Sequence, residues 1–189
     1  MRICLVRHGE TDWNNIGKLQ GREDVPMNTT GINQVKETAK YLKNFAWKAI
    51  ISSPLSRARM SAEIIAAEIG TIEIYEEGDF IERDYGAASG MTAEERKANF
   101  PDGNWTGVEP AEALQQRTLA ALSRSIEKFE GGDIIIVSHG SAINSILAYY
   151  SNNEIGTGRT ALKNAGMVLL EKDEGEIKIV SYDKIAYEF

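Results

Sequence analysis

The two histidines of the chain stand in the same local setting. His8 comes two positions after the apolar run Ile3–Val6, His139 comes two positions after the run Ile134–Val137, and a glycine follows each histidine. Each run is typical of a strand that is buried on both faces of a parallel sheet. Ligands of open α/β sheets bind at the carboxyl ends of the strands, so parallel strands would bring both imidazoles to one edge.

Basic side chains at the same edge suit an anion such as a phosphate group. Arg7 ends the first strand and supplies positive charge with a planar set of donors. Arg57 falls in the first turn of the helix expected after the second strand, and helix N-termini favour anions. We therefore predict that Arg7, Arg57, His8 and His139 form one anion-binding pocket.

The order of the motifs adds a resemblance to a known family. The chain is similar to the histidine phosphatase superfamily, also called phosphoglycerate mutase-like, in the segments Arg7–Thr11 with Asn14, Ser53–Ala58, Glu82 and Ser138–Gly140. These segments occur in family order over nearly the whole chain. The resemblance implies a phosphohistidine intermediate, no cofactor, and a catalytic set made of His8, Glu82, His139, Arg7 and Arg57.

The implied roles agree with the chemistry of these side chains. A neutral imidazole at His8 is not repelled by a phosphate monoester, and we expect a backbone carbonyl to hold its other ring nitrogen. Arg7, Arg57 and His139 would surround the phosphate oxygens. Glu82 would protonate the leaving alcohol and later accept a proton from water, although an ordinary surface carboxylate is the alternative.

Candidate substrate-binding residues are Asn14, Arg22, Arg83, Tyr85 and Gly140. Asn14 would add a neutral donor. Arg22 lies in a loop expected at 19–26, where a solvated arginine is the alternative. The segment 82–87 resembles one in cofactor-dependent phosphoglycerate mutases whose Arg and Tyr contact the substrate, which assigns that possibility to Arg83 and Tyr85. These side chains hint at a small acidic or sugar phosphate.

Two reactions are open within the family, namely hydrolysis of the phosphohistidine and its transfer to a second hydroxyl. The segment 19–24 resembles the phosphatase branch, and the chain lacks the mutase insertion with its paired arginines. Ala88-Ser89-Gly90 replaces the Trp-Glu-Gly of many family phosphatases, which leaves the substrate open. We favour a phosphatase that hydrolyses small phosphate monoesters, with mutase-type phosphoryl transfer as the alternative.

Three other classes of function fit the sequence less well. A metal site would put a cation beside two arginines, and no His-x-x-x-His pair occurs, so we expect a metal-independent enzyme. A serine esterase would need glycine two positions before Ser138, where Ile136 stands. A non-catalytic phosphate-binding module would not need the proton-transfer group Glu82, so the presence of Glu82 counts against it.

Net charge and composition limit which kinds of partner and which cellular compartment are expected. The 189 residues carry a net charge of −7, which argues against a general nucleic-acid surface and requires any anion site to be local. The single cysteine, Cys4, lies within the first strand and cannot form an internal disulfide. With neither a secretory signal nor a membrane span expected, the predicted setting is the cytoplasm, with a small phosphorylated metabolite as partner and no membrane. The oligomeric state is not predicted.

Alternating strands and helices predict an α/β fold, a three-layer α/β/α sandwich with a mostly parallel sheet and an antiparallel end. One domain is expected over 1–189, with a small cap or insert region at about 77–110. Expected strands are 3–6, 49–52, 72–75, 134–137 and a hairpin of 167–171 with 177–181. Expected helices are 29–45 capped by Thr29 or Thr30, 54–69 capped by Ser53, 92–98 capped by Thr92, 109–129 and one through 143–150. The polar segment 152–160 is expected to be a mobile flap.

Overall fold

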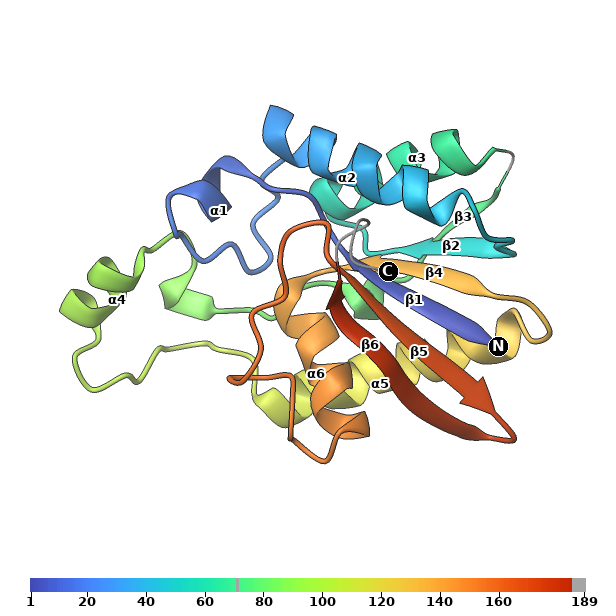
Figure 1. Cartoon of the computed structure of the whole chain (residues 1–189). Coiled ribbons are helices and arrows are strands. Elements are labelled where there is room, and N and C mark those ends of the chain that lie inside the picture. Colours follow the sequence, from blue (N-terminus) through green and yellow to red (C-terminus); the bar gives the residue numbers. More distant parts are fainter. Residues whose placement is uncertain (71, 185–189) are drawn as a thin grey trace.

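The computed structural model describes residues 1–70 and 72–184, in which a six-stranded sheet forms the central layer (Figure 1). The strands are β1 (Arg2–Arg7), β2 (Ala49–Ser52), β3 (Ile74–Glu76), β4 (Ile134–Ser138), β5 (Met167–Asp173) and β6 (Glu176–Lys184). Their order is β3-β2-β4-β1-β5-β6, in which β3, β2, β4 and β1 are parallel and β5 and β6 are antiparallel. This confirms the predicted mostly parallel sheet with an antiparallel end.

The helices are α1 (Asp12–Asn15), α2 (Thr29–Leu42), α3 (Ser56–Ile69), α4 (Ala93–Asn99), α5 (Ala111–Lys128) and α6 (Gly140–Tyr150), with short 3-10 turns at Gly78–Phe80 and Gly86–Ala88. Helices α2 and α3 cover one face of the sheet and α5 and α6 cover the other (Figure 1). Side chains alternate along each strand, so Ile3 and Leu5 pack with residues of α5 and α6 while Cys4 and Val6 pack with residues of α2 and α3. Both faces are covered, which explains the continuous apolar runs.

The central pair of strands brings the two histidines together. β1 and β4 are neighbours in parallel register, and Arg7 is paired with Ser138. The next residue on each strand is a histidine, and the backbone N–H of His8 donates to the carbonyl of Ser138 at 3.0 Å. The carboxyl edge of the sheet therefore holds both imidazoles, as the sequence predicts.

The start of α3 differs from the prediction. The helix begins at Ser56 with Leu55 at the cap position, so the assignment of Ser53 as N-cap and Pro54 as first helical residue is wrong. The carboxylate of Asp24, which comes from a distant loop, accepts the backbone N–H of Ser56 at 2.7 Å. The hydroxyl of Ser53 lies before the helix and accepts the N–H of Leu55 at 3.4 Å.

Other element ends also shift by a few residues. Asn28, rather than Thr29 or Thr30, caps α2 by accepting the N–H of Gly31, and the helix ends at Leu42. The third strand begins at Ile74 instead of residue 72. The cap of α4 at Thr92 and the hairpin of β5 and β6 are confirmed.

Two irregular regions border the carboxyl edge of the sheet. The region 77–110 begins against the sheet, where Phe80 belongs to the core, and its later part extends away from the sandwich and carries α4 (Figure 1). In the segment 152–160, the hydroxyl of Thr160 donates to Oδ1 of Asn144 on α6 at 2.9 Å. Among the described residues, every helix is too short or too polar to cross a lipid bilayer.

Candidate active site

A pocket of about 220 Å³ lies at the carboxyl ends of β1 and β4. Seven of the residues predicted for the site line it, namely Arg7, His8, Asn14, Arg57, Glu82, Tyr85 and Gly140. The ring of His139 is buried behind the lining, with its centroid 5.2 Å from that of His8. A larger hollow of about 880 Å³ adjoins the pocket along α2, but Arg7 is the one residue of the predicted set in its described lining.

His8 is held in one orientation by its own neighbour. Its Nδ1 lies 2.7 Å from the carbonyl oxygen of Gly9, as predicted, so Nδ1 carries the proton and Nε2 carries the lone pair. Burial lowers the pKa of His8 well below its ordinary value, and the charges of Arg7 and Arg57 lower it further. The imidazole is therefore neutral at neutral pH, which is the form that can act as a nucleophile.

Unlike His8, His139 is held at Nε2, and its partner is a residue distant in the sequence. The hydroxyl of Ser53 lies 2.7 Å from Nε2 of His139. Nδ1 is buried and makes no hydrogen bond within the part of the chain that the structure describes. Burial lowers the pKa of His139 well below its ordinary value, and Arg57 is the next largest cause. Nδ1 is thus the atom of this ring that is left for a ligand.

Backbone carbonyls orient the two guanidinium groups. Arg7 donates from a terminal nitrogen to the carbonyl of Leu162 at 2.5 Å. Arg57 is fully buried and donates to the carbonyls of Glu23 at 2.6 Å and Gly21 at 2.8 Å. Burial lowers the pKa of Arg57 to about 10, so it remains charged at neutral pH. Both cations thus reach the pocket in defined positions.

Glu82 lies against the N-terminus of α6. One carboxylate oxygen accepts the N–H groups of Arg83 at 2.8 Å and Ala142 at 3.1 Å, and the other accepts the N–H of Ser141 at 3.1 Å. A Cβ atom built on Gly140 would stand 3.6 Å from Nε of Arg7 and 3.9 Å from Glu82. Gly140 therefore lies between the cation and the carboxylate, and Glu82 is no surface residue.

Asn14 and Tyr85 complete the rim of the pocket. Oδ1 of Asn14 accepts the N–H of Thr11 at 3.1 Å and Nδ2 of Asn164 at 3.2 Å, which leaves the amide nitrogen of Asn14 as the donor for a ligand. The hydroxyl of Tyr85 lies 2.5 Å from that of Ser141, the second residue of α6. Both side chains are thus fixed to elements that also position the catalytic candidates.

Arg22 and Arg83 are not brought into the pocket. Arg22 is 44% exposed and pairs with Glu109 at 3.5 Å and with Asp84 at 3.9 Å. Arg83 donates to the carbonyl of Glu109 at 2.9 Å and lines a separate hollow beside Trp105. Their suggested contact with the substrate remains a prediction.

Some residues of the site were not found by sequence reasoning. Ser53 is one, because the Ser-Pro pattern predicts a helix cap, whereas the structure places Ser53 directly after the end of β2. Gln20 is buried and lines the pocket, and Leu162 supplies the carbonyl that holds Arg7. Neither has a signal in the sequence, since both depend on how distant loops fold over the sheet edge.

Gly9, the glycine after His8, is required by close backbone packing. In the structure, a Cβ atom on Gly9 would stand 2.4 Å from the carbonyl oxygen of Gly31 in α2. Gly9 is therefore needed so that the loop after β1 can pack against α2.

These side chains together can bind and attack a phosphate group. The pocket combines a neutral imidazole with a defined lone pair, two guanidinium groups and a carboxylate held by backbone donors, and a second imidazole, His139, is buried behind its lining. Within residues 1–70 and 72–184, no three His, Cys, Asp or Glu side chains gather closely enough to hold a metal ion.

Fold and pocket define a phosphoglycerate mutase-like α/β protein, and comparison with known proteins gives the family. The model of the histidine phosphatase superfamily (branch 1) matches residues 3–184, so the chain belongs to this superfamily. "Uncharacterized phosphatase PhoE" of Bacillus subtilis (strain 168) is 41% identical over 181 residues, which cover 96% of this chain and 93% of that protein.

Of two further relatives, one is named as mutase-like and the other as a phosphatase. "Phosphoglycerate mutase-like protein 4" of Arabidopsis thaliana is 36% identical over 157 residues, which cover 76% of this chain and 68% of that protein. A phosphoserine phosphatase of Entamoeba histolytica, solved in complex with 3-phosphoglyceric acid, matches with a TM-score of 0.82 and 27% identity over 97% of this chain and 96% of that one. The chain thus belongs among phosphatase or mutase enzymes.

Proposed function

We propose that the protein is a metal-independent phosphatase that hydrolyses small phosphate monoesters through a phosphohistidine on His8. The observation that carries the proposal is the state of this imidazole, which is buried, neutral and bonded through Nδ1 to Gly9. His8 lines a pocket that Arg7 and Arg57 also line.

The first step transfers the phosphoryl group to the enzyme. The lone pair of His8 Nε2 attacks phosphorus, and the bond between phosphorus and the ester oxygen breaks. Glu82, protonated at this stage, gives its proton to the leaving oxygen, so the product is a neutral alcohol. Arg7, Arg57 and His139 stabilise the charge on the three phosphoryl oxygens as it redistributes.

The second step restores the enzyme. A water molecule attacks phosphorus while the carboxylate of Glu82 takes up one of its protons. The bond between phosphorus and Nε2 breaks, the electron pair returns to His8, and inorganic phosphate leaves. Glu82 is then protonated for the next cycle, so each group returns to its starting state without a cofactor.

The substrate class follows from the size and charge of the pocket. A volume of about 220 Å³ is below the range of drug-sized ligand sites, which suits a phosphate group with a small organic part. Asn14 and Tyr85 at the rim are donors for a polar substrate. A small acidic or sugar phosphate fits this description, and the Entamoeba relative was solved with 3-phosphoglyceric acid.

Mutase-type transfer is the second candidate, and the Arabidopsis relative named as mutase-like favours keeping it. Against it, Arg22 and Arg83 are engaged with Glu109 instead of extending a binding surface for a second acidic group. We therefore place hydrolysis first.

The test is a hydrolysis screen over phosphorylated metabolites, with mutase activity assayed in parallel and after dialysis against EDTA. We expect release of inorganic phosphate that survives chelation, and an acid-labile, alkali-stable phosphoenzyme on rapid quenching. Transfer to a second hydroxyl without phosphate release would favour the mutase. Binding of phosphate without turnover of any ester would indicate a non-catalytic module, and loss on chelation with recovery on adding a divalent ion would indicate a metal enzyme.

A further inference from the structure

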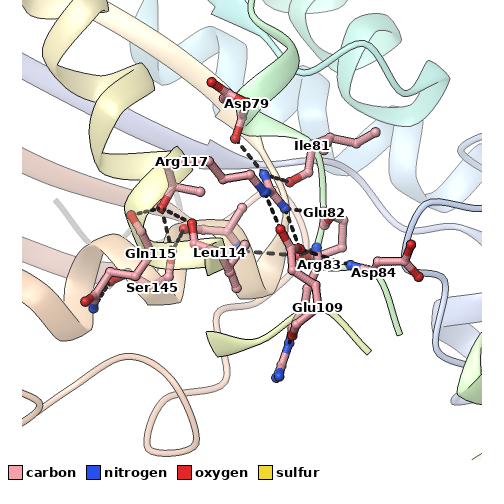
Figure 2. Close-up of polar contacts among 12 residues, drawn as sticks. Asp79, Ile81, Glu82, Arg83, Asp84, Glu109, Leu114, Gln115, Arg117 and Ser145 are labelled. Carbon is pink, nitrogen blue, oxygen red and sulfur yellow. Dashed lines mark hydrogen bonds and ion pairs between the residues drawn. The ribbon is translucent and has the colours of Figure 1, made fainter. Parts of the chain in front are cut away.

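Each backbone carbonyl from residue 79 to residue 82 accepts a hydrogen bond from a side chain. The carbonyls of Asp79, Ile81 and Glu82 accept hydrogen bonds from Arg117 of α5 at 2.6, 2.7 and 3.0 Å (Figure 2). The carbonyl between them, that of Phe80, accepts the hydroxyl of Ser138 at 2.7 Å. Only the start of this segment is helical, so its carbonyls depend on these side chains for hydrogen bonds.

Arg117 uses all of its donors in this arrangement. A guanidinium has five N–H groups in a fixed plane. Three bond to the carbonyls before and at Glu82, and the other two bond to the carboxylate of Glu109 at 2.7 and 2.9 Å (Figure 2). The side chains of Arg117 and Glu109 are only 14% and 11% exposed, so this bidentate pair is shielded from water.

Glu109 extends the same restraint to the residues after Glu82. Its carboxylate accepts the N–H of Asp84 at 3.2 Å, and its carbonyl accepts Nε of Arg83 at 2.9 Å. The backbone of Glu109 also donates to the carbonyl of Asp84 at 2.9 Å. The chain is therefore held on both sides of Glu82 by one ion pair.

The same turn of α5 also fixes the other partner of the Glu82 carboxylate. That carboxylate accepts N–H groups from the first turn of α6. Thr118, next to Arg117, contacts the hydroxyl of Ser145 in α6 at 2.9 Å, and Gln115 donates to the carbonyl of Ser145 at 3.3 Å. One turn of α5 thus sets the position of Glu82 and of the helix end that receives it.

We propose that Arg117, paired with Glu109, is a positioning residue that sets the Glu82 carboxylate for proton transfer. This inference rests on the proposed function, in which Glu82 is the acid. Arg117 does not line the pocket, so it acts through the backbone of Glu82 instead of through the substrate.

The test compares substrates whose leaving groups need different amounts of protonation. An alkyl phosphate needs a proton on its leaving oxygen, and a nitrophenyl phosphate needs far less help. With Arg117→Met and Arg117→Lys, single-turnover release of the alcohol is expected to slow on the order of 10²-fold, the effect of misplacing a catalytic group by about 1 Å. The rate with the nitrophenyl substrate should fall much less. Lysine keeps the charge but cannot reproduce the planar fork, so it should not rescue.

Arg124 provides the matched control. It lies on the same helix and pairs with the carboxylates of Glu77 and Asp79, but it is 49% exposed and donates to no carbonyl of the Glu82 segment. Arg124→Met should leave both substrates unchanged. If Arg117→Met acted only by removing positive charge near His139, the rates with both substrates would fall alike. The ratio of the two rates therefore separates positioning of Glu82 from loss of charge.

A double-mutant comparison decides whether Arg117 acts through Glu82. In a Glu82→Gln background, Arg117→Lys should add little further loss on the alkyl substrate. The proposal would be overturned if the rate loss of the double variant equalled the product of the two single losses. Equal losses on both substrates in the Arg117 single variants would also overturn it. If Arg117→Met melts below the assay temperature, Arg117→Lys and the nearly isosteric Glu109→Gln carry the same expectation. An active His8→Ala enzyme would instead overturn the proposed function, whatever the Arg117 variants do.

Discussion

The strand ends that carry His8 and His139 have the same local pattern but hold their imidazoles in opposite ways. His8 is bonded at Nδ1 by the carbonyl of the next residue, Gly9, which leaves Nε2 free. His139 is bonded at Nε2 by Ser53, which is 86 residues away in the chain, and this leaves Nδ1. The orientation of the first imidazole is thus local, and that of the second depends on how β2 and β4 pair.

This difference suggests a division of labour. A nucleophile must keep one lone pair on one atom, and a bond to a neighbouring backbone carbonyl does so whatever the ligand state. A hydroxyl can donate or accept, so the bond between Ser53 and His139 persists in either protonation state of that imidazole. His139 is therefore suited to take up a proton when a phosphate group arrives, while His8 remains neutral.

The largest expected effect separates the two imidazoles. His8→Ala should abolish turnover, because no other group can attack phosphorus in line. His139→Ala should retain a phosphohistidine that forms more slowly, on the order of 10²–10³-fold, the usual loss when a charge-stabilising donor is removed. Rapid-quench trapping of the phosphoenzyme in both variants measures this. A phosphoenzyme in His8→Ala, or none in His139→Ala, would reverse the assignment.

The glycines after the two histidines should respond differently to the same substitution. Gly9→Ala places a methyl group against the backbone of Gly31, with the Cβ atom 2.4 Å from a carbonyl oxygen, and neither side can move easily. We expect a loss of about 1–3 kcal/mol in the free energy of unfolding, typical of overpacking. Gly140→Ala has ordinary contacts from 3.6 Å and should keep the stability of the parent. Urea unfolding of both variants tests this, and equal stabilities would contradict it.

Removing the long-range partner of His139 should give a smaller effect. Ser53→Ala deletes the hydrogen bond to His139, worth ~1 kcal/mol, so kcat/KM should fall about five- to tenfold. It also removes the longer bond, at 3.4 Å, from the N–H of Leu55. Ser56→Ala is the control, because the hydroxyl of Ser56 makes no hydrogen bond within the described chain. In NMR spectra, Ser53→Ala should change the imidazole signals of His139 and leave those of His8 in place. An unchanged rate would show that the bond has no part in catalysis.

The smallest effect is a shift in titration, and the presence of only two histidines makes it measurable. Burial lowers the pKa of both imidazoles in the folded protein, so both should still be neutral at the ordinary histidine pKa of about 6.5. The unfolded chain binds protons below that pH and the folded chain does not. The free energy of unfolding should therefore fall as the pH drops below about 6.5. NMR titration of either imidazole at or above 6.5 in the ligand-free protein would contradict this.

Much of the fold and most of the pocket could be predicted because their determinants are local. The runs Ile3–Val6 and Ile134–Val137 can be buried only in a covered sheet, and the residue after a strand ends at its carboxyl edge. Arg7 ends β1, His8 and His139 directly follow β1 and β4, and Arg57 falls in the first turn of the helix after β2, so parallel neighbouring strands bring all four to one edge. The order of the family motifs added Glu82, which no periodicity marks.

Only the tertiary structure decided which groups hold these side chains. The hydroxyl of Ser53 contacts His139 because β2 and β4 are paired, and Arg22 and Arg83 lie outside the pocket because Glu109 engages them. Hydrogen bonds of this kind join residues far apart in the chain, and their geometry is set by how loops cross the sheet edge. Local sequence patterns do not indicate which residues far apart in the chain will form hydrogen bonds. The sequence therefore determined which residues meet, and the packing of the loops determined which atom of each remains for a ligand.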